Sequence, residues 1–129
     1  MSRRGPVRIS IQNLQASYRP RDELDCVIRV EPATSATVST IETRVQWKTI
    51  GKGDEDQGVC FLDRQGLSLQ DGLTAKTLRL NCPLPPCPLS FRGSLFQIRW
   101  SVSVRVELRE DASCEEEFPF EIKTGCQPG

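Results

Sequence analysis

The sequence predicts an all-β fold, an antiparallel two-layer β-sandwich. Apolar and polar residues alternate in several separate stretches, and this period of two is typical of strands with one buried face. Polar turns separate the stretches at the spacing expected of a sandwich, and no window carries the apolar stripe of a helix. The number of strands alone leaves a closed barrel open as an alternative.

Three alternating stretches fill the first part of the chain. The first runs from Val7 to Ile11, the second covers 23–30, and the third covers 41–49, where β-branched residues favour a pleated strand. A turn over 17–23 separates the first two strands, because its proline fixes the local backbone. The segment 31–40 consists largely of small residues and is predicted to be a loop.

The middle of the chain is less regular. Its three glycines and its charged residues make 51–59 a loop, and a short strand is predicted over 59–64. Residues 65–73 follow no clear period, and Asp71-Gly72 marks a turn. The next strand is indicated by three residues on one apolar phase: Leu78, Leu80 and Cys82.

The strand from Phe96 to Leu108 has the strictest alternation in the chain. Its apolar face consists of Ile98, Trp100, Val102, Val104, Val106 and Leu108. The opposite face, which we expect to be exposed to water, consists of Arg99, Ser101, Ser103, Arg105 and Glu107. Both tryptophans, Trp47 and Trp100, lie on the apolar phase of a strand and are therefore expected in the core.

Two strands are candidates for the edges of the sheets. The last predicted strand is marked by Phe118, Phe120 and Ile122. Pro119 lies within it and cannot donate a hydrogen bond to a ladder, so an edge position is expected. The other candidate is the first strand, with Val7, Ile9 and Ile11. Because unpaired edges bind other strands, each edge is predicted to bind a partner protein or a second copy of the chain.

Length and charge restrict the class of protein. The 129 residues predict a single domain, 1–129, with a core from about 7 to 123 and short flexible termini. Lys+Arg and Asp+Glu number 17 each, and this zero net charge argues against a nucleic-acid partner. No apolar run approaches the roughly 20 residues of a membrane span, although peripheral association with a membrane stays open.

The six cysteines are expected to be reduced. The first residues do not form a signal peptide, so a cytoplasmic location is predicted, and thiols rather than three disulfides follow from it. A disulfide between Cys114 and Cys126 across a hairpin stays conceivable. Cys82 and Cys87 lack the second close pair that a zinc site needs.

The chain contains no histidine, which removes the commonest general base and metal ligand. Ser–His and Cys–His nucleophilic pairs are thereby excluded within this sequence. The loop over 51–59 also lacks the spacing of a phosphate-binding loop. No catalytic residue and no cofactor are therefore predicted.

The acidic loop carries the sharpest chemical hypothesis. Asp54, Glu55 and Asp56 offer oxygens suited to calcium, but three consecutive acids point in different directions and Lys52 would compete with the cation. We interpret these four residues as a solvated hairpin tip that could recognise a partner. The alternative is a metal-binding protein, or an enzyme that uses carboxylates and thiols, centred on the segment from Asp54 to Cys60.

Two motifs match a known family. In the segment 17–30, SYRPRDELDCVIRV, the matching residues are Tyr18, Pro20, Asp22 and Leu24. In the second motif they are Leu84, Pro85, Pro88, Ser90, Phe91, Gly93, Ile98, Val102 and Val104, with Trp100 in an aromatic position. In these motifs the chain resembles the amino-terminal lobe of the arrestin-like superfamily, which includes the α-arrestins and a retromer subunit with the same immunoglobulin-like sandwich.

The resemblance covers about 7–122 and implies a non-enzymatic adaptor or scaffold that binds proteins along strand edges and loops. Arg21 stands where the family has glycine in the first turn. An arrestin has two lobes and this chain resembles one, so mechanisms that move one lobe against the other are not carried over. The loop over 51–59 lies outside the family pattern, and we associate it with bacterial single-lobe relatives.

Overall fold

The computed structural model describes residues 6–33, 36–51, 53 and 55–124. Within these residues the chain forms nine strands and one short 3-10 helix, η1 (Asp71–Leu73), at the turn that the sequence predicts. The two chain ends, for which flexible termini are predicted, lie outside the described residues.

The smaller layer is a three-stranded antiparallel sheet with the strand order β1-β3-β6. Its strands are β1 (Val7–Gln12), β3 (Glu23–Pro32) and β6 (Lys76–Pro83). All three lie where the alternation of apolar residues predicts a strand, and each extends slightly beyond the predicted range. Strands β1 and β6 are therefore the outer strands of this layer.

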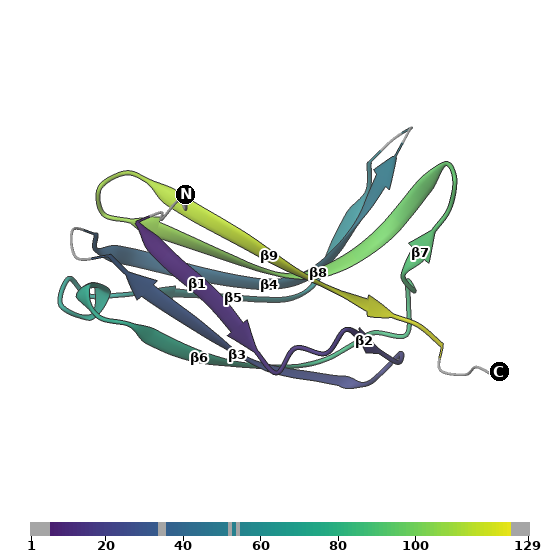
Figure 1. Ribbon diagram of the computed structural model, residues 1–129, viewed down its shortest axis with the longest axis horizontal. Coiled ribbons are helices and arrows are strands. Elements are labelled where there is room, and N and C mark those ends of the chain that lie inside the picture. The colour runs from purple at the N-terminus through teal and green to yellow at the C-terminus, as the bar shows by residue number, and fades with distance from the viewer. Residues whose placement is uncertain (1–5, 34–35, 52, 54, 125–129) are drawn as a thin grey trace.

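The larger layer has the strand order β2-β9-β8-β4-β5, and the short strand β7 pairs with the far end of β8. Its strands are β2 (Ser17–Tyr18), β4 (Val38–Gly51), β5 (Gln57–Gly66), β7 (Phe91–Arg92), β8 (Phe96–Leu108) and β9 (Ser113–Ile122). The two layers lie one above the other in Figure 1. The predicted two-layer sandwich is confirmed, with one exception to its antiparallel pairing, because β2 runs parallel to β9.

The core lies between the layers and is centred on β8. Trp100, Val102, Val104 and Val106 are at most 1% exposed. They form one cluster with the buried residues of β3: Leu24, Cys26, Ile28 and Val30. Each large apolar side chain buried in this way contributes about 1.5–3 kcal/mol. The Trp100 indole also donates a hydrogen bond of 3.0 Å to the carbonyl of Pro88, which satisfies its one polar group.

The outer face of β8 is not exposed at its centre, contrary to the prediction. Ser101 and Ser103 are only 6% and 1% exposed. In the sheet Ser103 lies between Arg44 of β4 and Glu117 of β9. Longer side chains on both neighbouring strands cover the short serines, and the Ser103 hydroxyl donates a 2.9 Å hydrogen bond to Glu115. Alternation along one strand does not reveal this lateral cover.

Strand β5 is longer and more exposed than the short strand predicted over 59–64, and its Val59 and Leu62 are 48% and 59% exposed. Its neighbour in β4, Trp47, is half-buried, so the expectation that it lies in the core is only partly right. The register between β4 and β5 shifts just before this tryptophan. Its indole lies against the backbone of Gly58, where an added Cβ would be 2.3 Å from the ring nitrogen.

Strand β9 begins at Ser113, well before the predicted start at Phe118. The run of three glutamates before Phe118 hides the first half of this strand in the sequence, because glutamate has a low strand propensity.

The far ends of β4 and β8 extend beyond the smaller layer. Figure 1 shows these ends, with β7, rising away from β3 and β6. Phe91, Leu95 and Phe96 lie in this region and are 48%, 72% and 40% exposed. The rings of Phe91 and Phe96 contact each other, with centroids 5.1 Å apart. The alternation of β8 therefore continues into a part of the strand, near its first residues, that the smaller layer does not cover.

The turn before β3 places an arginine in an unfavourable conformation. The amide of Asp22 donates to the carbonyl of Arg19 (3.1 Å), and the Asp22 carboxylate accepts from the Arg19 amide (2.9 Å). Pro20 occupies the second position of this turn, and Arg21 occupies the third with a φ of 71°. A turn of this kind favours glycine at the third position, and a side chain there costs about 1–2 kcal/mol.

We expect Arg21→Gly to raise the free energy of unfolding by about 0.5–1 kcal/mol. The relief of left-handed strain exceeds the entropy that glycine adds to the unfolded chain. Urea unfolding followed by circular dichroism measures the change. Arg19→Gly is the matched control, because Arg19 does not have a positive φ and should gain nothing. A loss of stability in Arg21→Gly would contradict the assigned turn.

Gly72 in η1 is buried against β4. A Cβ atom at this position would lie 2.0 Å from the backbone oxygen of Val38, so alanine forces the backbone apart. We expect Gly72→Ala to lower the free energy of unfolding by about 1–3 kcal/mol. Gly66→Ala is the control, since a Cβ there meets nothing within 4 Å. Equal stabilities of the two variants in urea would show that η1 does not rest on β4.

Candidate functional site

The acidic loop between β4 and β5 does not assemble a reactive centre among the described residues. Lys52 and Asp54 lie outside the described residues, while Glu55 and Asp56 are exposed. The amide of Asp56 donates to the Thr49 hydroxyl (2.8 Å), and its carboxylate accepts from the Gln57 amide (2.9 Å). Asp56 thus helps to close the hairpin.

Cys60 does not join these acids. Its sulfur lies 3.9 Å from the sulfur of Cys82 in β6. Burial of this sulfur, reinforced by Cys82, raises the pKa of Cys60 to about 12, so the thiol is protonated at neutral pH and is a poor nucleophile. No three Cys, Asp or Glu side chains gather closely enough to hold a metal in the described part of the chain. The alternative of a metal site or thiol enzyme therefore gains no support.

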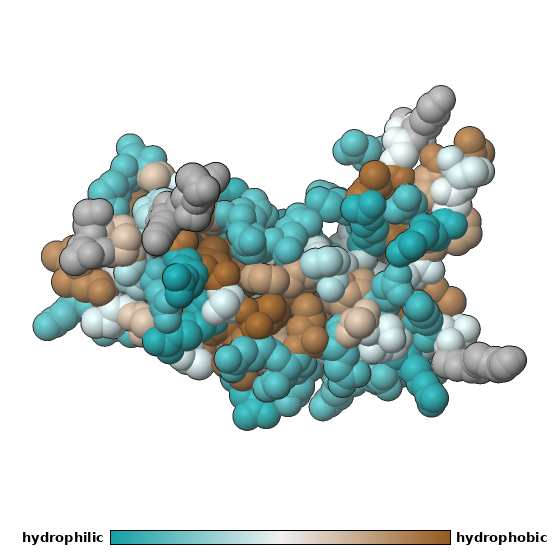
Figure 2. Space-filling model, in the orientation of Figure 1, coloured by the Kyte–Doolittle hydropathy of each residue, from teal (hydrophilic) through white to brown (hydrophobic). Residues whose placement is uncertain are grey.

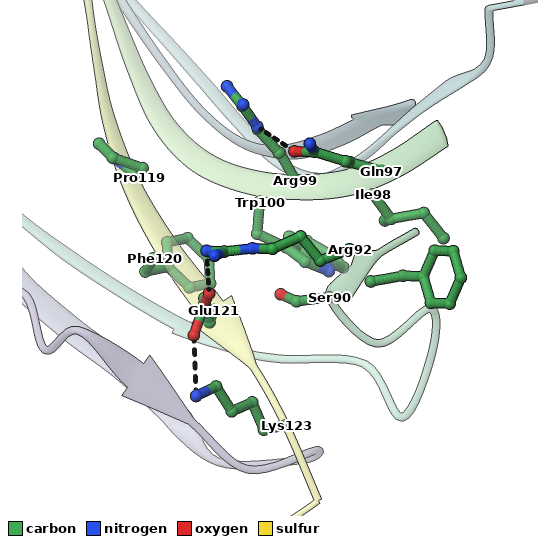
Figure 3. A pocket seen from close by; sticks show the side chains of 11 residues that line it. Ser90, Arg92, Gln97, Ile98, Arg99, Trp100, Pro119, Phe120, Glu121 and Lys123 are labelled. Carbon is green, nitrogen blue, oxygen red and sulfur yellow. Dashed lines mark hydrogen bonds and ion pairs between the residues drawn. The ribbon is translucent and has the colours of Figure 1, made fainter. Parts of the chain in front are cut away.

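A pocket with a volume of about 830 Å³ lies where β7, β8 and β9 meet (Figure 3). At its edge Glu121 forms ion pairs with Arg92 (3.3 Å) and Lys123 (3.0 Å). Arg99 projects from β8 and donates a hydrogen bond to Gln97 (3.1 Å). The lining contains no thiol, and its one carboxylate is already paired with two cations. This arrangement provides no general acid and base.

The outer edge of β1 carries free backbone groups. The amide of Ala33 donates a hydrogen bond to the carbonyl of Pro6. The backbone amides and carbonyls of the even-numbered residues of β1 therefore point toward β3. Because hydrogen-bonded and non-bonded pairs alternate in an antiparallel ladder, the backbone groups of the odd-numbered residues point away from β3. Within the described residues, the amides and carbonyls that point away from the sheet are those of Val7, Ile9 and Ile11. These are the residues that the sequence indicates as one edge.

The outer edge of β9 is protected differently. The Glu121 amide donates a hydrogen bond to the carbonyl of Ala16, next to β2. The backbone amides and carbonyls of the odd-numbered residues of β9 therefore point away from β8. At one of these positions Pro119 has no amide hydrogen. The exposed Glu116 lies opposite Val104, on the face of the sheet that is turned toward the core. A proline and an inward-facing charge are features that discourage strand pairing.

The edges of β1 and β9 lie on the same side of the sandwich, where the two strands approach each other. Between them is an apolar seam, which we define as Ile9, Ile11, Cys114 and Phe118. These side chains are partly buried and lie against the core. Figure 2 shows hydrophobic surface in this region, between the positions of β1 and β9 in Figure 1. A free backbone edge therefore runs beside an incompletely covered apolar surface.

The opposite side of the sandwich also has open edges, which are not among the edges that the sequence predicts. Strands β5 and β6 are outer strands of the two layers. Charged and polar side chains occupy both faces of the second half of β5, from Asp63 to Gln65. This loss of alternation was the available signal that β5 is exposed on both faces.

The comparisons with known proteins establish the fold. No model of a protein family matches the chain, and no curated protein matches it in sequence. The chain is similar to the crystal structure of Spo0M, a sporulation control protein from Bacillus subtilis, with a TM-score of 0.71 and 12% sequence identity. The match covers 94% of this chain and 51% of the Spo0M chain, so the chain spans about half the length of that protein.

At this identity the likeness shows the fold alone, and it supports the arrestin-like sandwich fold that the sequence motifs indicate. Among the described residues, no helix is both long enough and apolar enough to span a bilayer.

Amide hydrogen exchange can show which backbone amides of β1 lack a hydrogen bond to β3. We expect the amides of Val7, Ile9 and Ile11 to exchange markedly faster than those of Arg8 and Ser10, which are bonded to β3. Amides of β3 serve as the internal control, because this central strand is bonded on both sides. Uniform protection along β1 would mean that the edge is already covered in solution.

Proposed function

We propose that the chain is a non-enzymatic adaptor or scaffold module that binds an extended segment of a partner protein along β1. The observation that carries this proposal is the free edge of Val7, Ile9 and Ile11 beside the apolar seam. Strand addition uses the backbone groups of such an edge for affinity and alternate side chains for selectivity. The lack of an assembled acid, base or metal site among the described residues fits a binding role better than a catalytic one.

The geometry indicates what the partner segment looks like. A strand that pairs with β1 directs every second side chain toward the seam, where Ile11 and Phe118 offer apolar contacts. Glu116 lies on the same face of β9 as Phe118, and its negative charge would favour a basic residue among the partner side chains that point toward the seam. The partner segment is therefore an alternating strand with apolar residues and at least one Lys or Arg on its inner face.

A second copy of the chain is the other occupant that this edge would accept, since β1 itself alternates. The acidic hairpin tip, of which Glu55 and Asp56 are described and exposed, would supply a further contact in either case. The module would act in a reducing compartment such as the cytosol, where its cysteines would be thiols.

Ile9→Pro tests the edge directly. Proline removes the outward-facing amide of position 9, whereas the hydrogen bonds between β1 and β3 use the even-numbered positions. The matched control is Thr77→Pro on β6, which removes an outward-facing amide from the opposite edge of the same sheet. Circular dichroism must first show that both variants are folded.

We expect the wild-type chain to co-purify with a partner protein from the native cell. The Thr77→Pro variant should still bind this partner, and the Ile9→Pro variant should not. Titration of that purified partner should then show at least a tenfold increase in Kd for Ile9→Pro, about 1.4 kcal/mol. Sedimentation of the chain alone distinguishes self-association, which Ile9→Pro should also abolish. Equal binding by both variants would refute the β1 edge as the site.

A further inference from the structure

Cys60 and Cys82 come from opposite layers of the sandwich, and their sulfurs lie 3.9 Å apart. Cys60 belongs to β5 and Cys82 to β6, the outer strands of the larger and smaller layers. We propose that these two thiols are a site of reversible disulfide formation that joins the layers on the side opposite the apolar seam. This proposal does not depend on the function proposed for β1.

A local irregularity brings the two sulfurs together. Val45 of β4 pairs with Phe61, and Gln46 pairs with Val59, so Cys60 is an additional residue in β5 without a direct partner. Such a bulge bends the strand and redirects its side chains. Cys82 lies on the inward phase of β6 and is buried. The bulge thus allows an exposed cysteine of one layer to reach a buried cysteine of the other.

The bond requires only a small movement. A disulfide has an S–S distance of about 2.0 Å, so the two sulfurs must approach each other by about 1.9 Å. Rotation about the first side-chain torsion of Cys60 can supply such a displacement, because this residue is exposed. A cavity of about 270 Å³ also lies between β5 and β6, lined by Phe61 and Leu80 among others, so the two strands are not tightly packed along their whole length.

The oxidant is hydrogen peroxide, and the reaction proceeds in two balanced steps. The Cys60 sulfur attacks one peroxide oxygen, the O–O bond breaks, and a sulfenic acid and one water form. The Cys82 sulfur then attacks the Cys60 sulfur, which forms the S–S bond and releases the sulfenic oxygen as a second water. Two thiols lose two electrons and two hydrogens in total, and the peroxide accepts them. Because burial raises the pKa of both thiols, the reaction should be slow.

The location of the pair determines its effect. The bond would close the chain between positions 60 and 82 and hold β5 against β6. It would leave β1 and β9 untouched, since these strands lie at the other side of both layers. The oxidised chain should therefore be more stable, with its β1 edge still free.

Peptide mapping of a Cys87→Ser variant tests the assignment. Trypsin places Cys60 in peptide 53–64 and Cys82 in peptide 80–92, which also contains Cys87 in the natural sequence. Replacing the exposed Cys87 makes the second peptide unambiguous. After incubation with hydrogen peroxide, we expect peptides 53–64 and 80–92 to be linked, with a mass two hydrogens below their sum. A reductant should separate them.

The same sample should unfold at a temperature about 10 °C higher than its reduced form, as expected for a loop of this length. The control is the double variant Cys60→Ser and Cys87→Ser, which should show neither the linked peptides nor the shift. Three results would overturn the proposal: Cys82 still reduced after complete oxidation of Cys60, a link from 53–64 to the Cys26 peptide 22–29, or a linked form that melts no higher.

Discussion

The burial of the apolar face of β8 against the smaller sheet is the interaction on which the other features depend. Trp100 and Val104 are fully enclosed, and β8 is flanked by β4 and β9, so the central strand has partners on both edges and on one face. The remaining strands are arranged around it. Strands β1 and β5, which are farther from β8, have a free edge within the described residues, and the candidate binding features lie at such outer positions.

Local alternation was sufficient to predict the fold class and the position of most strands. Leu24 to Val30 and Phe96 to Leu108 form strands where the sequence indicates them. Lateral neighbours could not be predicted, because which strand lies beside another depends on pairings distant in sequence. Ser103 is polar and lies in a predicted exposed phase, yet its neighbours bury it. Trp47 shows the opposite case, since it lies on an apolar phase and is paired on both sides, yet it is only half-buried.

The candidate site was predictable in part for the same reason. Pro119 predicts from local chemistry alone that β9 lies near an edge, and in the structure the two-residue strand β2 lies beyond it. The first strand of the chain was the other predicted edge. That β1 and β9 lie on one side of the sandwich, with apolar residues between them, depends on the order of strands in both sheets. The contact between Cys60 and Cys82 was likewise invisible, because it requires a bulge in β5 and the stacking of two sheets.

The ladder between β4 and β8 has a kinetic consequence. Val38 pairs with Leu108 and Gly51 with Phe96, so the two central strands are separated in the chain by β5, η1, β6 and β7. The entropy of closing this long loop must be overcome before the ladder forms, and sandwiches with such distant pairings fold in roughly milliseconds to seconds. During synthesis all three strands of the smaller layer are present once β6 has left the ribosome, whereas β4 and β5 of the larger layer still lack β8 and β9. Efficient folding of this chain therefore depends on how long its exposed strands stay apart from those of other molecules.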